Sequence, residues 1–233
     1  MSNTAELIPI TDGFLLAHHH APQQAQAAVL ILTPLGPDAE GAHQALVQLA
    51  DACGKRKQCT QRFDWRGTGD SSHALSDITP AMWIEDLKQV HSSLSKRGLP
   101  VRVIAPRGAG LLLAAAALAE LDRVLWWDPI AGADLLADWR ARHRHHCSQH
   151  GFATIERTGY ELCCGDWWRS ELLEWLAKQP EPHLEDVRQF RLCHERTAAA
   201  DLHSEDDAIW GAEALQALVP LVTLRAIVDW ICA

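Results

Sequence analysis

The sequence predicts an α/β domain with a mostly parallel sheet and helices on both faces. Ala27 to Thr33 is a continuous apolar run, which is typical of a strand that is covered on both sides. Between this run and Trp127, strand-like and helix-like segments alternate at the rhythm of right-handed crossovers. A chain of 233 residues has the length of one domain, so residues 1–233 are expected to form a single domain. Its functional residues are expected at the carboxyl ends of the parallel strands.

Local signals place the elements along the chain. Asp12 and Gly13 predict the turn of an antiparallel hairpin, and Thr79 with Pro80 predicts a helix start. The alternation is lost from Ile130 to Gln179, so a cap-like insertion is expected at about 130–180. The predicted strands are Glu6 to Ile10, Phe14 to His20, Ala27 to Thr33, Cys59 to Phe63, Val101 to the elbow, Arg123 to Trp127 and Val187 to Cys193. The predicted helices are Glu40 to Cys53, Pro80 to Gly98, a buried helix reaching Leu121, Asp138 to His150, Asp166 to Ala177, and Glu213 to Ile231 with a bend near Pro220.

Composition excludes several classes of function. The formal net charge is -9, and Lys55 to Lys57 is the only compact basic cluster, so a nucleic-acid surface is not expected. No charge-free apolar run has the length of a membrane helix, and the first residues lack the features of a signal peptide. A cytoplasmic protein without a transmembrane segment is therefore expected, with its seven cysteines as free thiols.

Val101 to Leu121 is the stretch around which the chain is organised. A short β-branched run stops at a Gly/Pro cluster and gives way to an apolar helix pattern. In an α/β-hydrolase this construction is the nucleophile elbow, G-x-S-x-G. Here the serine position holds Arg107, whose guanidinium stays protonated and has no lone pair for attack on a carbonyl.

The sequence resembles the α/β-hydrolase superfamily and, within it, the second type of exosortase A system-associated hydrolase. The resemblance covers most of the chain, and it rests mainly on the order of the motifs. Ala105 to Leu112 is similar to that group's own elbow, which also carries arginine, although Ala105 and Ala109 replace the elbow glycines. The other similar segments are Phe63 to Ser71 (D-x-x-G-x-G-x-S), Trp83 to Leu87, Leu125 to Pro129, Thr158 to Leu162, and Ile209-Trp210 with Pro220.

The resemblance implies a fold and a bacterial setting of exopolysaccharide production and exosortase-dependent sorting. It does not establish a reaction, because members of the group are called hydrolases by fold. No cofactor is expected. The implied partner is a small acyl or anionic ligand, or a protein of the envelope polysaccharide system.

Arg107 has two interpretations. It pairs with Asp128, because both follow strands that should be neighbours, and a buried guanidinium needs a partner. Alternatively it faces a pocket and holds a carboxylate or phosphate. The two can coexist, and we favour the ion pair. The predicted ligand-binding residues are Arg107, Gly108, Leu35 and Asp128.

Catalytic candidates outside the elbow are weaker. His203 precedes the last helix, where the superfamily's histidine usually lies, and Asp186 or Glu195 is placed to follow a late strand. A surface position for His203 is the simpler interpretation. If the chain is an esterase or thioesterase, its nucleophile is non-standard, with Ser71, Ser72 or a cap cysteine as candidates.

One helix also carries a possible metal site. His143, His146, Cys147 and His150 have spacings that place them on one helical face. A single helix rarely completes a tetrahedral site, and the neighbouring arginines repel cations. We therefore favour a solvated basic helix, and the leading hypothesis is a binding or accessory protein with impaired or absent serine-hydrolase activity.

Overall fold

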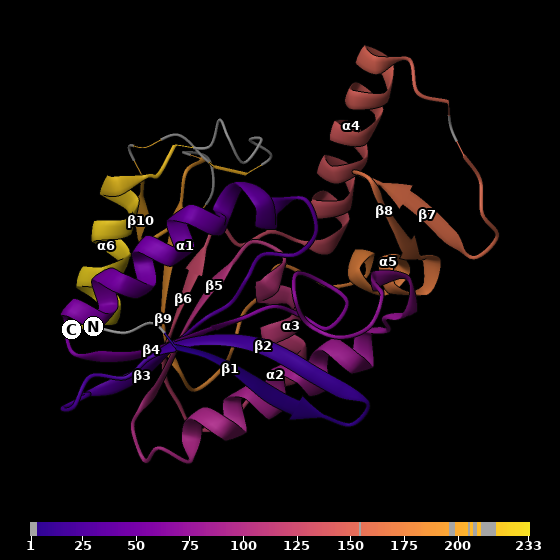
Figure 1. The fold of residues 1–233 in the computed structure, drawn as a ribbon. Coiled ribbons are helices and arrows are strands. Elements are labelled where there is room, and N and C mark those ends of the chain that lie inside the picture. The colour runs from indigo at the N-terminus through magenta and orange to yellow at the C-terminus, as the bar shows by residue number, and fades with distance from the viewer. Residues whose placement is uncertain (1–3, 154, 196–198, 205, 207–208, 211–217) are drawn as a thin grey trace.

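An eight-stranded, mostly parallel sheet forms the centre of the molecule (Figure 1). The structure is a computed structural model that describes residues 4–153, 155–195, 199–204, 206, 209–210 and 218–233. The strand order is β1-β2-β4-β3-β5-β6-β9-β10, in which β1 and β2 form an antiparallel hairpin and β2 pairs with β4 antiparallel. The other pairings in this sheet are parallel. The predicted fold class is confirmed.

The strands of the sheet follow the sequence expectation closely. Their bounds are β1 (Thr4–Ile10), β2 (Gly13–His20), β3 (Ala27–Ile31), β4 (Gln58–Phe63), β5 (Val101–Pro106), β6 (Leu121–Trp127), β9 (Arg188–Cys193) and β10 (Leu202–His203). Every residue of β3 and β5 is buried, as expected for strands that have helices on both sides.

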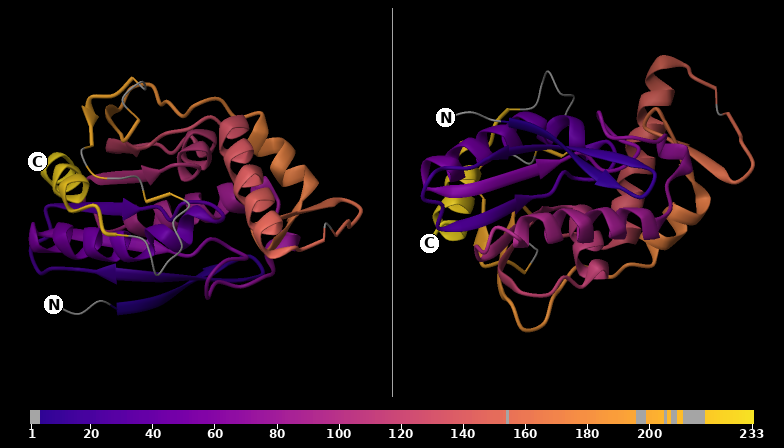
Figure 2. Two further views of the ribbon diagram at one scale, coloured as in Figure 1. Left: turned by 90° about the horizontal axis from the view of Figure 1, so that it is seen from above. Right: turned by 60° about the horizontal axis from the view of Figure 1, so that its bottom comes forward.

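Two helical layers cover the sheet, as the views in Figure 2 show. On one face α1 (Asp38–Lys55) packs beside α6 (Leu221–Ile231), and on the other α2 (Pro80–Ser95) packs beside α3 (Ala109–Ala116). Alternate residues of a strand point to opposite faces. Leu30 of β3 therefore lies in the α2/α3 core, whereas Ile31 lies in the α1/α6 core.

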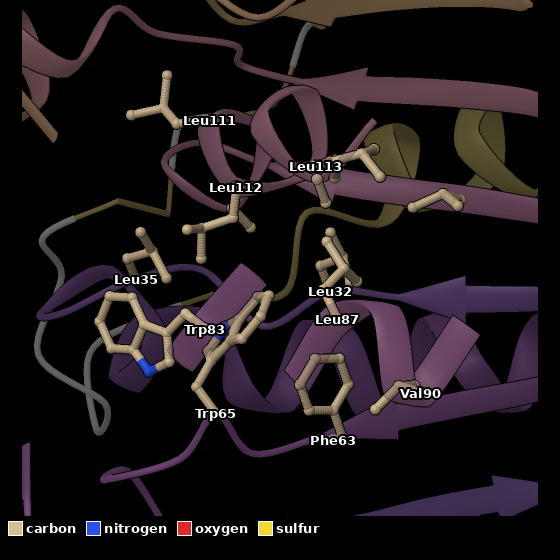
Figure 3. Packing of buried hydrophobic residues seen from close by; sticks show 14 of the residues in the cluster. Leu32, Leu35, Phe63, Trp65, Trp83, Leu87, Val90, Leu111, Leu112 and Leu113 are labelled. Carbon is tan, nitrogen blue, oxygen red and sulfur yellow. The ribbon is translucent and has the colours of Figure 1, made fainter. Parts of the chain in front are cut away.

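Tryptophans dominate the core on the α2/α3 side. Figure 3 shows Trp65 and Trp83 among leucines of α2, of α3 and of the segment that follows β3. The contacts continue outward, because Trp83 lies 6.1 Å from Trp168 and Trp168 lies 5.1 Å from Trp139, measured between ring centroids. This line of indoles fixes the next set of elements against the sheet.

At one end of the sheet lie α4 (Gly132–His150), a two-stranded sheet of β7 (Tyr160–Cys163) and β8 (Asp166–Arg169), and α5 (Ser170–Ala177) (Figures 1 and 2). These elements fall in the stretch where the sequence loses its alternation. A short 3-10 helix, Leu75–Asp77, contacts β8. That the stretch acts as a cap on a single domain stays a prediction.

Several helix bounds differ from the expectation. The Trp-rich helix begins at Ser170, not Asp166. Cys164 and Gly165 have positive φ and form the turn of a hairpin, so the residues from Asp166 to Arg169 are the strand β8 instead of the start of the helix. The helix after the elbow ends at Ala116, where Ala117 takes a left-handed conformation. The predicted residues 213–217 of the last helix lie outside the described part. No helix of the described chain combines the length and apolarity needed to cross a bilayer.

Candidate functional site

The carboxyl ends of β3 and β5 form the crevice in which an open α/β sheet normally binds its ligand. The two strands are neighbours, and their connections leave in opposite directions, through α1 to β4 and through α3 to β6. Arg107 follows β5 with a φ of +45°, and its N–H donates to the carbonyl of Trp127 at 2.8 Å. A left-handed residue here costs about 1–2 kcal/mol. The sharp elbow geometry is thus present, with arginine at its tip.

The side chain of Arg107 is held by two carboxylates. Its Nε donates to Asp38 at 3.2 Å, and its Nη2 donates to Asp138 at 2.6 Å. Arg142 binds the same two carboxylates, at 2.6 Å to Asp38 and 3.2 Å to Asp138. We call these four residues the elbow ion cluster. Two guanidinium groups meet two carboxylates, so the cluster is neutral.

Asp38 is the centre of the elbow ion cluster, and none of its surface is exposed. It is the first residue of α1, where the helix dipole stabilises a negative charge. The Nε1 of Trp139 also donates to it, at 3.4 Å. Burial lowers the pKa of Arg142, but the charge and hydrogen bond of Asp38 outweigh burial, so the pKa of Arg142 is raised overall. The buried carboxylate therefore holds Arg142 in its charged form.

The predicted pairing of Arg107 with Asp128 is wrong. Asp128 follows β6 with a φ of +48°, and its N–H donates to Leu192 of β9, so its carboxylate is directed toward β9. There it accepts the backbone N–H of His194 at 2.7 Å and lies 2.5 Å from Nδ1 of the same residue. Trp210 separates the two charged groups, because its ring lies 5.9 Å from Cζ of Arg107 while its Nε1 donates to Asp128 at 2.6 Å.

Leucine side chains fill the space beside the elbow. A Cβ built on Gly108 would lie 2.6 Å from Leu135 and 3.4 Å from Leu35, and both leucines are buried. On the neighbouring loop, a Cβ on Gly36 would lie 2.8 Å from the ring of Trp139. In a serine hydrolase this is the region where backbone amides bind the oxyanion. The ligand-binding roles of Leu35 and Gly108 stay predictions.

His203 and Asp186 lie apart from the elbow. His203 is exposed on β10 and has no side-chain partner among the described residues. Asp186 precedes β9 instead of following it, so it is exposed at the amino end of that strand. The expectation that Asp186 follows a late strand is therefore wrong, because β9 begins two residues later, at Arg188. Glu195 does follow β9, directly after His194.

His194 is the polar group that sequence reasoning missed. It lies at the carboxyl end of β9, and its Nε2 is 3.4 Å from the Oγ1 of Thr223, the third residue of α6. The hydroxyl of Ser204 is hydrogen-bonded to that of Thr223. The order carboxylate, imidazole, hydroxyl is that of a proton-transfer chain. Thr223 is only 1% exposed, so this arrangement gives a substrate little access to the hydroxyl.

The hydroxyls of the two serine candidates, Ser71 and Ser72, are hydrogen-bonded to the backbone. Ser71 donates to the carbonyl of Asp64 at 2.6 Å, and Ser72 donates to the carbonyl of Phe14 at 2.9 Å. Among the cap thiols, the pKa of Cys164 is lowered, first by a hydrogen bond with Cys163 and then by the charge of Arg142, against the effect of burial. Of the two adjacent thiols, Cys164 is thus the one that ionises more readily, because the pKa of Cys163 is raised.

The histidines of α4 do not converge on a common point. Among the described residues, no three His, Cys, Asp or Glu side chains are arranged to hold a metal ion. His146 and His150 pack against each other and against Phe152, with ring centroids 4.5–5.8 Å apart. His143 lies 3.7 Å from the sulfur of Cys147 and accepts the backbone N–H of Cys164 at 3.2 Å.

Comparisons with known proteins establish the fold. No family model matches the sequence, and no curated protein is similar to it in sequence. Ferulic-acid-bound Est1E from Butyrivibrio proteoclasticus is similar in structure, with a TM-score of 0.59 and 11% identity over 98% of this chain and 96% of that one. Alpha/beta hydrolase domain-containing protein 10 from mouse has a TM-score of 0.58 and 14% identity over 98% of both chains.

A weaker similarity links the chain to proline iminopeptidase from Mycobacterium smegmatis, with a TM-score of 0.43 and 22% identity. It covers 64% of this chain, which spans only 54% of that enzyme. The two longer alignments show that the chain has the α/β-hydrolase fold.

Proposed function

We propose that this α/β-hydrolase-fold protein lacks serine-hydrolase activity and acts as a binding or accessory protein. The observation that carries the proposal is the position of Arg107. It occupies the tip of the elbow with the left-handed conformation of a nucleophile, and its guanidinium is held by Asp38 and Asp138. A guanidinium stays protonated and has no lone pair for attack on a carbonyl, so Arg107 cannot act as the nucleophile of an acyl-transfer reaction.

The orientation of the histidine supports the same proposal. In a serine hydrolase the histidine takes a proton from the elbow hydroxyl. Here the Nε2 of His194 is 3.4 Å from Thr223 on α6, and Trp210 lies between Arg107 and the carboxylate that holds this histidine. The elbow therefore lacks a base as well as a nucleophile among the described residues.

The cellular setting is proposed from the resemblance in sequence. The segments from Phe63 to Ser71, Ala105 to Leu112 and Leu125 to Pro129 are similar to those of exosortase A system-associated hydrolases. We therefore place the protein in an exopolysaccharide or exosortase system, in the cytoplasm. Its ligand there is a small acyl or anionic compound, or a protein of the same system.

An ester or thioester hydrolase with a non-standard nucleophile is the second candidate. The Asp128–His194–Thr223 chain favours it, since the three groups stand in the order of a catalytic triad. Cys164, with its lowered pKa, offers a thiolate in place of a hydroxyl. Neither group lies at the elbow.

A labelling experiment separates the two candidates. Purified protein is treated with a fluorophosphonate probe and with iodoacetamide, and it is assayed on a panel of acyl esters and thioesters beside a known serine hydrolase. We expect no fluorophosphonate labelling and no turnover. Turnover that disappears in Thr223→Val, Ser204→Ala or Cys164→Ser, in a variant that still unfolds cooperatively, would establish the second candidate instead.

A further inference from the structure

A cleft of about 830 Å³ lies on α4, between this helix and the chain segment that leads into β7. Its volume is in the range of small-molecule sites, roughly 300–1,000 Å³. The described wall residues come from Arg140 to Cys147 on one side and Ile155 to Leu162 on the other. The cleft does not include Arg107, so it is distinct from the elbow.

The two walls of the cleft are joined by fixed contacts. Arg140 of α4 and Glu161 of β7 form a bidentate ion pair, with both N–O distances at 2.7 Å. The hydrogen bond from the backbone N–H of Cys164 to Nδ1 of His143 also links α4 to the hairpin. The cleft is thus formed by packed elements before any ligand arrives.

The charge of the cleft is positive in a chain that is strongly acidic. Glu161 neutralises Arg140, which leaves Arg144 and Arg157 on the wall against the single carboxylate of Glu156. Neither Arg144 nor Arg157 has an ion-pair partner among the described residues. Two arginines that form no ion pair among the described residues therefore line one small volume, although the chain as a whole carries a charge of -9.

Arg157 is also held in position before binding. Its Cζ lies 4.0 Å from the ring of Tyr160 and 5.9 Å from the ring of Trp167. Stacking of this kind fixes the plane of a guanidinium and leaves its N–H edge available for an anion. The apolar part of the same wall includes Ile155, whose surface is 61% exposed.

We propose that this cleft binds a small phosphate monoester with an aromatic or apolar body. The phosphate accepts hydrogen bonds from Arg144 and Arg157. Guanidinium groups match phosphate oxygens in geometry as well as charge, which favours phosphate over a neutral ligand. The body of the ligand covers Ile155. The proposal holds whether or not the chain hydrolyses esters, because the cleft and the elbow share no residue.

Calorimetric titration of the full chain with 1-naphthyl phosphate tests the proposal, with 1-naphthol and inorganic phosphate as comparison ligands. The variants are Arg144→Gln and Arg157→Gln. Arg225→Gln is the matched control, because Arg225 is an exposed arginine that lines a different cavity, between α1 and α6. Thermal unfolding of each variant verifies that it folds.

Saturable binding of 1-naphthyl phosphate is expected, weakened about tenfold or more by either cleft substitution and unchanged by Arg225→Gln. Inorganic phosphate should compete, and 1-naphthol should bind about tenfold less tightly or worse. The proposal is overturned if 1-naphthyl phosphate does not saturate the protein, if 1-naphthol binds equally well, or if Arg225→Gln weakens binding as much as the cleft variants.

Discussion

The elbow ion cluster and the α4 cleft use the same kind of residue under opposite conditions. At the elbow, Arg107 and Arg142 meet a fully buried carboxylate, and Trp139 covers it. Arg144 and Arg157 line the cleft and form no ion pair with any carboxylate in the described part of the chain. Both regions include residues of α4, which turns Arg142 toward the elbow and Arg144 toward the cleft.

This difference shows what decides the role of an arginine in this fold. The charge of a guanidinium that is paired with a buried carboxylate is balanced within the protein, so it attracts an anionic ligand less strongly. A guanidinium that stacks on an aromatic ring keeps its charge and its donors. At the elbow the arginine is therefore engaged in ion pairs, whereas the arginines of the proposed binding cleft lie outside the elbow.

Removal of Asp38 should have the largest effect on this comparison. The Asp38→Ala substitution leaves Arg107 and Arg142 close together with only the half-exposed Asp138 between them. Breaking a buried pair in this way costs about 3–5 kcal/mol. Urea unfolding measures the loss. Asp229→Ala, which breaks the exposed pair with Arg56, is the control and should cost below about 1 kcal/mol. Equal losses would mean that the elbow cluster is not a structural centre.

Substitution of Arg107 by serine should cost less in stability and should not restore catalysis. Asp38 keeps Arg142 as a partner, so we expect a loss of about 3 kcal/mol, at the lower end for a broken buried pair. The introduced hydroxyl has no base, because His194 faces Thr223. Fluorophosphonate labelling of Arg107→Ser should therefore stay at background. Labelling at the introduced hydroxyl would show that a base reaches the elbow.

Tight packing above the elbow predicts a smaller effect at Gly36. Its φ is +58°, and an added Cβ would lie 2.8–2.9 Å from the ring of Trp139. Gly36→Ala should cost about 2 kcal/mol, from the left-handed conformation together with overpacking. Gly98→Ala is the matched control, since Gly98 has a φ of +69° with nothing within 4 Å. Urea unfolding measures the loss in the free energy of unfolding for each variant. The loss should be about 1 kcal/mol larger for Gly36→Ala than for Gly98→Ala, and this difference reports the packing against Trp139 alone.

The sequence was sufficient for the sheet and for the elbow. Continuous apolar runs identify β3 and β5 because both strands are covered on two faces, and this property depends on local composition. The position of Arg107 after β5 follows from the same pattern.

The partners of the charged groups could not be read from the sequence. The principle that a buried guanidinium finds a carboxylate holds for Arg107, but Asp38 lay before the predicted helix start and Asp138 belonged to a helix interpreted as solvated. The histidine of an α/β-hydrolase usually precedes the last helix, which is the position of His203, whereas His194 directly follows β9. These contacts depend on the tertiary arrangement of α1, α4 and β9, which local sequence patterns do not determine.

The pair between Arg140 and Glu161 should have the smallest effect, and it shows how the cleft responds to pH. The hydrogen bond with Arg140 holds the pKa of Glu161 below its usual 4.5. A depressed pKa adds stability above the unfolded value, and this contribution is lost as the pH falls through the folded value. Glu161→Gln should therefore cost below about 1 kcal/mol at neutral pH, because the pair is partly exposed.

Urea unfolding at several pH values tests this prediction. The difference in the free energy of unfolding between Glu161→Gln and the wild type should shrink below pH 4.5. Glu156→Gln is the matched control, because Glu156 lies on the same wall and forms no ion pair among the described residues. A similar trend in both variants would assign the effect to the general charge of the cleft instead.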